Sequence, residues 1–266
     1  MKLVLSVSNG FEKYASVALH SFFKHHNIKE GVTIFIICET VTGSLEKLKW
    51  FEKKHSCSIY FKVVDVRLLS HSVVNGHVSI ATYFRLLLAE MLPNESKVLY
   101  LDCDLLINGS LLELWNKNID KYAIGAVQEK KFAMHEKLGF PLGKPYFNAG
   151  VLLINLNFWR SNDLTKQYLN FLKINSERIS FWDQDVLNMV LQDHCLFIEE
   201  KWNYVPTQDH IENGVAIIHF AGAHKPWEIH YPYPKIKRSF LKYCLHQPFA
   251  TVSYLQYAKA VVKSIA

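Results

Sequence analysis

The chain lacks the features of a protein that crosses a membrane or is exported through one. None of its apolar runs reaches the ~18 residues that a transmembrane helix needs. Only five residues separate Lys2 from the polar segment Ser8-Asn9-Gly10, too few for the apolar centre of a signal peptide. We therefore expect a cytoplasmic protein.

Cysteine is scarce, and its spacing excludes two further classes of protein. The five cysteines are scattered, odd in number and never arranged as CxxC: Cys38, Cys57, Cys103, Cys195 and Cys244. An odd number of scattered cysteines without a CxxC pair argues against a disulfide framework and a cysteine zinc site. Free or buried thiols are the expectation.

Acidic residues are absent from Ile229 to Ala266, although six basic residues lie there: Lys235, Lys237, Arg238, Lys242, Lys259 and Lys263. Subtracting these six from the 30 Lys and Arg leaves 24, which equals the 24 Asp and Glu, so residues 1–228 are formally neutral. This balance argues against a nucleic-acid-binding surface on the main part of the chain. It favours a basic C-terminal segment that meets an anionic partner.

The last residues of this segment have the pattern of an amphipathic helix. Prolines interrupt its beginning at Pro232, Pro234 and Pro248. From Phe249 onward one helical face is apolar and the other polar or basic, with Val252, Leu255, Val262 and Ile265 opposite Ser253, Gln256, Lys259 and Lys263. Such a helix is typical of interfacial attachment to an anionic membrane. The alternative is a C-terminal helix that packs on the domain with its lysines in water. We expect a domain over residues 1–228 and a membrane-associating tail over residues 229–266.

The first part of the chain has the alternating pattern of an α/β domain. Apolar segments predict strands at Leu3–Val7, Val32–Cys38 and Ile59–Val64, and periodic segments predict helices at Tyr14–Phe23 and Leu45–His55. This order favours a parallel sheet with crossover helices. Later segments predict helices at Ser79–Met91, Phe158–Ile174 and Asp183–Leu191, and strands at Val98–Asp104, Ala123–Val127, Val151–Asn155 and Val215–Phe220.

Two carboxylates interrupt the apolar run that includes the predicted strand Val98–Asp104. Val98 to Leu101 is apolar, Asp102 and Asp104 follow with one residue between them, and the apolar run resumes at Leu105. Residues two apart in an extended chain point to the same side, so the two carboxylates can converge. They repel each other unless a cation or hydrogen-bond donors lie between them. A divalent metal at the end of a central strand is one interpretation, and aspartates that simply meet solvent are the other.

A second polar cluster follows the last predicted strand. His219 ends this strand, Gly222 follows three residues later, and Lys225 three residues after that. With Asp102 and Asp104, His219 would complete a site for Mn²⁺ or Mg²⁺ that leaves positions for diphosphate oxygens. A histidine satisfied by neighbouring groups at a strand end is the alternative.

Five segments in this order give the chain a family resemblance. They are Ser79-Ile80-Ala81-Thr82-Tyr83-Phe84-Arg85-Leu86, Val98 to Asp104, Tyr146-Phe147-Asn148-Ala149-Gly150-Val151-Leu152-Leu153-Ile154-Asn155, Trp182-Asp183-Gln184-Asp185-Val186-Leu187-Asn188, and His219-Phe220-Ala221-Gly222 with Lys225-Pro226-Trp227. The chain resembles the family 8 retaining glycosyltransferases, which include glycogenin and bacterial lipopolysaccharide galactosyl- and glucosyltransferases.

The resemblance implies a GT-A fold, a single Rossmann-like nucleotide-binding domain with a mixed central sheet. It also implies a UDP-hexose donor, UDP-galactose or UDP-glucose, and a Mn²⁺ ion held by Asp102, Asp104 and His219, with Mg²⁺ as an alternative. Donor contacts are implied at Ser6, Ser8, Arg85, Asp102, Cys103, Asp104, Asn148, Ala149, Asp183, Gln184, His219, Gly222 and Lys225. Lys225 and the Gly222 N–H would meet the phosphates. Asp183 and Gln184 are the implied catalytic residues, with Gln184 beside the anomeric carbon.

Several of these residues also have a purely structural interpretation. Arg85 could be a structural ion-pair partner, and Asn148 could serve a turn. The acidic residues near Gln184 could serve only the first turn of a helix. Ser8 stands where family members usually have an acidic residue that binds uracil, so base recognition is weakened. Glu129 lies near the position of an acid that faces the acceptor.

The function expected on these grounds is transfer of galactose or glucose, with retention, to lipopolysaccharide core or lipooligosaccharide at the inner face of the cytoplasmic membrane. A glycogenin-like enzyme that glucosylates its own tyrosines is a second hypothesis. A non-catalytic module that binds a sugar nucleotide or glycan is a third, although such a module would not need the metal ligands.

Overall fold

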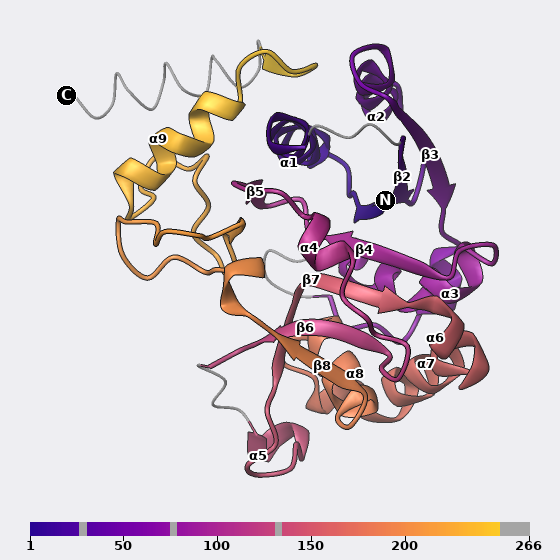
Figure 1. The fold of residues 1–266 in the computed structure, drawn as a ribbon. Helices are drawn as coiled ribbons and strands as arrows, with labels where there is room; N and C mark the ends of the chain where they lie inside the picture. The colour runs from indigo at the N-terminus through magenta and orange to yellow at the C-terminus, as the bar shows by residue number, and fades with distance from the viewer. Residues whose placement is uncertain (27–30, 75–78, 131–134, 251–266) are drawn as a thin grey trace.

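A computed structural model describes residues 1–26, 31–74, 79–130 and 135–250 of the chain (Figure 1). The strands are β1 (Lys2–Ser6), β2 (Val32–Cys38), β3 (Cys57–Val63), β4 (Lys97–Leu101), β5 (Leu105–Ile107), β6 (Ile124–Gln128), β7 (Phe147–Asn155), β8 (Cys195–Ile198) and β9 (Ile217–His219). The α-helices are α1 (Glu12–His25), α2 (Gly43–Glu46), α3 (Leu88–Met91), α4 (Leu112–Trp115), α5 (His135–Leu138), α6 (Leu156–Ser161), α7 (Leu164–Asn175), α8 (Trp182–Leu191) and α9 (Pro234–Tyr243). Short 3₁₀ helices are η1 (Lys47–Lys53), η2 (Val66–Leu69), η3 (Ile80–Leu87), η4 (Ser176–Arg178) and η5 (Glu200–Trp202).

Seven strands form one mixed sheet in the order β3-β2-β1-β4-β7-β6-β8. The first four of these are parallel, β7 runs antiparallel to both its neighbours, and β6 pairs in parallel with β8. The chain moves outward from β1 to β3 and then returns to place β4 on the other side of β1. Ligands of open α/β sheets bind at such a switch point, outside the carboxyl ends of the strands.

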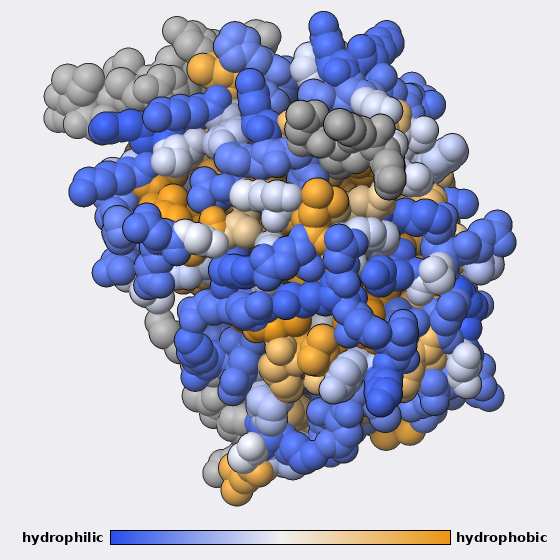
Figure 2. Space-filling view, viewed as in Figure 1, coloured by the Kyte–Doolittle hydropathy of each residue, from blue (hydrophilic) through white to orange (hydrophobic). Residues whose placement is uncertain are grey.

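Alternating side chains of the central strands supply two separate cores. Leu3 and Leu5 of β1 pack in a cluster with α1, β5, β9 and α9. Val4 of the same strand packs with α3, α6, α7 and α8 on the opposite face. A strand covered on both faces is apolar along its whole length, which explains the continuous apolar runs of β1 and β4. On the face drawn in Figure 2, hydrophilic residues surround small, separate apolar areas. The expected α/β class with a mixed central sheet is confirmed.

Three predicted helices differ in form from the expectation. The helix expected at 158–174 is two helices, because the chain turns at Asp163, whose φ is 48°. The Asn155 side chain caps α6 by accepting the Phe158 N–H at 3.0 Å, so this helix also begins earlier. The segment predicted as one helix over 79–91 is mostly the 3₁₀ helix η3, and the one over 45–55 is mostly η1.

The strand expected from Val98 to Asp104 also divides. It leaves the seven-stranded sheet after Leu101, and the chain re-enters a two-stranded sheet at Leu105, where β5 pairs antiparallel with β9. The two aspartates therefore lie in the bend between two sheets, and not along one extended strand. The register of this second sheet places Leu105 opposite His219.

The first part of the predicted tail belongs to the core. Pro234 begins α9, a position where the missing N–H costs no helical hydrogen bond. Ile236 and Phe240 are buried in the α1-side cluster, and the Ser16 hydroxyl of α1 donates to Gln247 Oε1 at 2.6 Å. The amphipathic helix predicted beyond Phe249 lies almost entirely outside the described residues. Among the residues that the structure does describe, no helix is long and apolar enough to span a membrane.

Replacing Phe240 with alanine should therefore destabilise the whole domain. The ring is fully buried, and its centroid lies 5.4 Å from that of Phe220, directly after β9. Phe→Ala substitutions at such sites cost ~3–5 kcal/mol of unfolding free energy, measurable by urea denaturation. Lys242→Ala on the exposed side of α9 is the matched control and should change it by less than ~0.5 kcal/mol. Equal effects of the two substitutions would contradict the inclusion of α9 in the core.

Candidate active site

A pocket of about 530 Å³ opens at the carboxyl ends of β1 and β4, at the switch point of the sheet. Every residue for which a donor contact was expected lines this pocket: Ser6, Ser8, Arg85, Asp102, Cys103, Asp104, Asn148, Ala149, Asp183, Gln184, His219, Gly222 and Lys225. Glu129 lines it as well. The fold thus brings together residues that lie more than 200 positions apart in the sequence, while their individual roles remain predictions.

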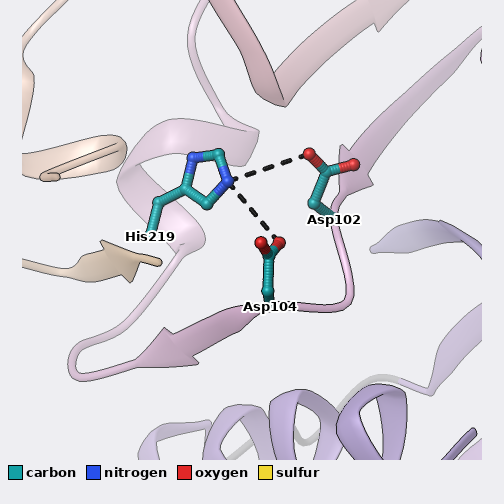
Figure 3. A group of neighbouring side chains, drawn as sticks. All are labelled: Asp102, Asp104 and His219. Carbon is teal, nitrogen blue, oxygen red and sulfur yellow. Dashed lines mark ion pairs between the residues drawn. The ribbon is translucent and has the colours of Figure 1, made fainter. Parts of the chain in front are cut away.

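Asp102, Asp104 and His219 form a compact group at the centre of the pocket (Figure 3). His219 Nε2 lies 3.8 Å from Asp102 Oδ2 and 3.5 Å from Asp104 Oδ1. The aspartates come from the β4–β5 bend, and the imidazole reaches them from the end of β9. One imidazole nitrogen and two carboxylate oxygens in such proximity are a donor set suited to Mn²⁺ or Mg²⁺.

Each aspartate of this group uses one oxygen for a cationic side chain and directs the other toward His219. Asp102 Oδ1 accepts from Arg85 Nη2 at 2.8 Å and from the Tyr100 hydroxyl at 3.0 Å. Asp104 Oδ2 accepts from Lys225 Nζ at 2.5 Å. Asp102 Oδ2 and Asp104 Oδ1 are the oxygens nearest the imidazole, so a metal ion could bind without breaking either ion pair.

The charges of the pocket favour such an ion. Four carboxylates line it, from Asp102, Asp104, Glu129 and Asp183, against the two cations of Arg85 and Lys225. Burial alone would raise the pKa of Asp104, but His219 and Lys225 outweigh burial and hold this pKa below its usual value. The carboxylate is therefore ready as a ligand. A pocket with this excess of negative charge would repel a diphosphate unless a divalent cation were present.

Gly150 supplies the space in which the imidazole sits. A Cβ atom at this position would lie 2.1 Å from His219 Cε1 and 2.6 Å from Nδ1, far closer than any real contact. Steric exclusion thus explains why position 150 is a glycine. Any larger residue at this position of β7 would displace the His219 ring from the aspartates.

Arg85 connects Asp102, a member of the group of candidate metal ligands (Asp102, Asp104 and His219, here the metal-ligand group), to the neighbouring Asp183. Its guanidinium is buried and binds Asp102, the Ala149 carbonyl at 2.5 Å, and Asp183 Oδ2 with Nε at 2.8 Å. Asp183 Oδ1 accepts a hydrogen bond from the Thr82 hydroxyl. Burial raises the pKa of Asp183 to about 6, although Arg85 and Thr82 act in the opposite direction. Arg85 is therefore an ion-pair partner, as the structural interpretation had it, and it also lines the pocket.

The residues around Asp183 are held by the turn before α8. Asp185 Oδ2 accepts the N–H groups of Ser180 and Phe181, both at 2.7 Å, and the same carboxylate accepts the Tyr146 hydroxyl at 2.6 Å. Asp185 thus stabilises the first turn of α8, which is the structural role considered for the acidic residues near Gln184. Gln184 points into the pocket instead, where its Oε1 accepts the Ala149 N–H at 2.9 Å.

The first strand and the segment after it supply another part of the pocket lining. Ser6 ends β1, Ser8 follows it, and the partly exposed ring of Phe11 lies next along the chain. The Cys103 thiol donates to the Ser6 carbonyl at 3.1 Å, and burial raises its pKa well above the usual value, which makes it a structural thiol. Gly222 has a φ of +86°, a conformation that favours glycine and turns the loop back toward Lys225.

Sequence reasoning missed four residues that the structure places at or behind the site: Phe11, Thr82, Tyr100 and Asn203. Tyr100 could have been found, because it lies two positions before Asp102 on one side of β4. Thr82 could have been found from its spacing of one helical turn to Arg85. Asn203, which bonds both His219 and Asn148, follows a short 3₁₀ helix and had no local signal.

Comparison with known proteins identifies the class. The model of glycosyl transferase family 8 matches residues 2–230, and the chain belongs to this family. It is therefore a glycosyltransferase of the GT-A fold, as the sequence resemblance implied. The chain superimposes with a TM-score of 0.82 on the crystal structure of the galactosyltransferase LgtC in complex with donor and acceptor sugar analogues, at 26% identity over 91% of this chain and 95% of that one.

Two curated relatives span most of the chain. A putative glycosyltransferase of Haemophilus influenzae is 28% identical over 243 residues, 85% of this chain and 73% of that protein. The lipopolysaccharide 1,3-galactosyltransferase of Salmonella typhimurium is 29% identical over 228 residues, 79% of this chain and 67% of the relative.

The raised pKa of Asp183 predicts a pH dependence of stability in metal-free protein. A carboxyl with a pKa of about 6 in the fold and 3.8 otherwise takes up a proton on folding between these values. Its contribution is fully present below about pH 4 and is lost as the pH rises through 6. At ~1.4 kcal/mol per pKa unit, wild type should lose ~3 kcal/mol relative to Asp183→Asn between pH 4 and pH 7, measured as urea unfolding free energies.

The exposed Asp193 provides the matched control for this measurement, and Asp193→Asn should show no such loss. A difference between wild type and Asp183→Asn that stays constant with pH would mean that Asp183 titrates as an ordinary carboxyl.

Proposed function

We propose that this glycosyltransferase moves galactose or glucose from a UDP-hexose to a glycan with retention, and that Mn²⁺, or Mg²⁺ as the alternative, is its metal. The observation that carries the proposal is the group of Asp102, Asp104 and His219, in which each carboxylate keeps one oxygen facing the imidazole. The location of this group at the switch point of the sheet suits a nucleotide diphosphate. A binding module without catalysis would not require this donor set.

The pocket offers a distinct surface to each part of the donor. The face of Phe11 can stack on the uracil ring, and the Ser8 hydroxyl can accept its N–H. The Lys225 ammonium and the Gly222 N–H can bind the phosphates. Asp183, held by Arg85 and Thr82, can accept hydrogen bonds from the hydroxyl groups of the hexose.

Charge develops on the UDP phosphate as the glycosidic bond breaks. The metal ion would act as a Lewis acid on the diphosphate and lower the energy of this charge. Lys225 forms an ion pair with Asp104, where its positive charge would add to this effect.

Retention without a covalent intermediate fits the residues that line the pocket. Gln184 is an amide and a poor nucleophile, and Asp183 is occupied by Thr82 and Arg85. We therefore propose front-face attack, in which the departing phosphate takes the acceptor proton and Gln184 Oε1 faces the positive charge on the sugar. A glycosyl ester trapped on Asp183 or Glu129 of the wild-type enzyme would contradict this route.

The relatives support a lipopolysaccharide or lipooligosaccharide acceptor. One is named a lipopolysaccharide 1,3-galactosyltransferase and another, from Escherichia coli and 31% identical over 176 residues, a lipopolysaccharide 1,2-glucosyltransferase. A lipid-linked acceptor would place the enzyme at the inner face of the cytoplasmic membrane.

The proposal predicts metal-dependent transfer by the full chain. UDP-galactose or UDP-glucose with Mn²⁺ should release UDP and add a hexose to core oligosaccharide, measured by UDP assay and mass spectrometry. Chelation should abolish turnover and Mn²⁺ should restore it. Asp104→Ala or His219→Ala should lower kcat by at least ~10²-fold, because charge on the leaving group is no longer stabilised.

The exposed carboxylate of Asp193 again serves as control, since Asp193→Ala removes a charge far from the pocket lining and should leave turnover unchanged. Full activity in excess chelator would refute the metal assignment. A hexose found on the protein itself would favour self-glucosylation.

We further propose that the basic tail holds the enzyme on an anionic membrane. Helix α9 buries Ile236 and Phe240 and exposes Lys235, Arg238 and Lys242, so the described part of the tail presents positive charge outward. Lys259 and Lys263 lie outside the described residues.

The triple variant K235Q/R238Q/K242Q tests this attachment in a chain that keeps its apolar contacts. Each basic residue near an anionic surface contributes ~1 kcal/mol, so partition onto vesicles containing phosphatidylglycerol should fall by ~100-fold. Sedimentation with such vesicles measures this, and wild-type binding should weaken with salt. K166Q/K173Q/R178Q, a change of equal charge on the exposed side of α7 and η4, is the control. Equal losses in both variants would show a general charge effect and contradict a role for α9.

A further inference from the structure

A chain of buried hydrogen bonds runs from the backbone of β7 to the imidazole of His219. The Gly150 N–H donates to Asn148 Oδ1 at 2.9 Å, Asn203 Nδ2 donates to the same oxygen at 2.9 Å, and Asn203 Oδ1 lies 2.9 Å from His219 Nδ1. All three side chains are buried, with exposed fractions of 8% for Asn148, 3% for Asn203 and 4% for His219. Water therefore does not compete for these bonds.

The first hydrogen bond of this series, from the Gly150 N–H to Asn148, determines the direction of the others. A backbone N–H can only donate, so the Asn148 atom that faces Gly150 must be its oxygen. Asn203 must then present its NH₂ group to that oxygen and its own oxygen to His219. His219 Nδ1 therefore carries the hydrogen, and the lone pair lies on Nε2. Nε2 is the atom that faces Asp102 and Asp104.

The backbone fixes where Asn203 lies. The next residue, Tyr204, donates its N–H to the Ile217 carbonyl at 3.0 Å and accepts the His219 N–H at 2.8 Å. These bonds hold the segment after η5 alongside β9, with Tyr204 paired to Ile218, and from this position the Asn203 side chain reaches His219. A rigid neighbour can select one imidazole tautomer, whereas a mobile one cannot.

We infer that Asn203 is a positioning residue for His219, which it holds in the tautomer and orientation that make Nε2 a metal ligand. The inference rests on the proposed metal site. It adds a residue that is neither one of the three candidate ligands nor part of the pocket lining, and that acts through its bonds to His219 and Asn148. The same amide also fixes the orientation of Asn148, whose NH₂ group then faces Glu129 at 3.4 Å. One buried side chain thus orients a metal ligand and a pocket residue together.

The first experiment needs no substitution at Asn203. Long-range ¹H–¹⁵N correlation spectra of metal-free wild-type protein should show His219 with hydrogen on Nδ1, its peaks being assigned by their loss in His219→Gln. Hydrogen on Nε2 with none on Nδ1 in these spectra would overturn the inference.

The second experiment measures Mn²⁺ affinity, by electron paramagnetic resonance of free Mn²⁺, without any donor or turnover. Asn203→Leu removes the oxygen that accepts the His219 Nδ1–H, and should weaken Mn²⁺ binding by ~10–100-fold. In this variant the spectra should no longer show His219 with hydrogen on Nδ1 alone. Asn203→Asp keeps an acceptor for Nδ1–H while losing the bond to Asn148, and should retain the tautomer and most of the affinity. Asn155→Leu, which removes a side chain that caps α6 at the far end of β7, is the matched control and should leave both unchanged.

The outcomes separate the inference from the proposed function. If wild type binds Mn²⁺ and His219→Gln does not, but Asn203→Leu binds as wild type does, the inference fails and the metal site stands. If wild type does not bind Mn²⁺, both fail. Should Asn203→Leu not fold, the wild-type spectra and the Asn203→Asp comparison still decide the matter.

Discussion

The repulsion between Asp102 and Asp104 is the constraint on which the rest of the site depends. Two carboxylates in a partly buried bend are stable only when opposite charge surrounds them. The fold supplies this charge from two directions: Arg85, on the sheet side, binds Asp102 Oδ1, and Lys225, on the loop side, binds Asp104 Oδ2. The other oxygens, Asp102 Oδ2 and Asp104 Oδ1, face His219 and could bind a cation. The bend leads directly into β5, which pairs with β9 and places Leu105 opposite His219. The aspartates and the histidine therefore cannot separate without breaking this small sheet.

Arg85 extends this arrangement toward the sugar end of the pocket. One planar guanidinium binds Asp102, Asp183 and the Ala149 carbonyl, and it lies 4.3 Å from the centre of the Tyr100 ring. Burial alone would lower the pKa of Arg85, but Asp102 and Asp183 outweigh it and raise this pKa. Removing one partner from such a buried network costs ~3–5 kcal/mol, because a charge is left without compensation. The metal-ligand group and the catalytic candidates are thus parts of one electrostatic unit.

The loop after β9 is tied to α1 and α9 by aromatic contacts. Trp227, two residues after Lys225, stacks on Tyr14 of α1 with ring centroids 3.6 Å apart, and its ring lies 5.7 Å from that of Phe240 in α9. Phe11 meets Trp227 edge to face at 6.3 Å. The loop that carries Gly222 and Lys225 therefore rests on α1 and α9. This contact gives α9 a part in shaping the pocket, in addition to any part in membrane attachment.

The sequence by itself determined the class of fold and the family, and the resemblance to this family named thirteen residues that line the pocket. The order of apolar segments was sufficient for the α/β class, because buried strands are continuously apolar. The pocket residues came instead from family motifs that are contiguous in the chain: the aspartate pair, the Asn148-Ala149-Gly150 segment and the His219 loop. Local patterns also misled: the spacing of apolar residues gave one helix where Asp163 turns the chain, and one strand where the chain passes between two sheets at Asp102.

Only the tertiary structure decided which oxygen of each aspartate faces His219, why residue 150 is a glycine, and that Asn203 is bonded to His219. These features depend on distances between segments that are far apart in the chain. Asn203 follows no motif, and its partners lie 16 and 55 positions away, on β9 and β7. Sequence periodicity reports which side of an element is buried, whereas the partner of a buried polar group is set by the register and packing of whole strands.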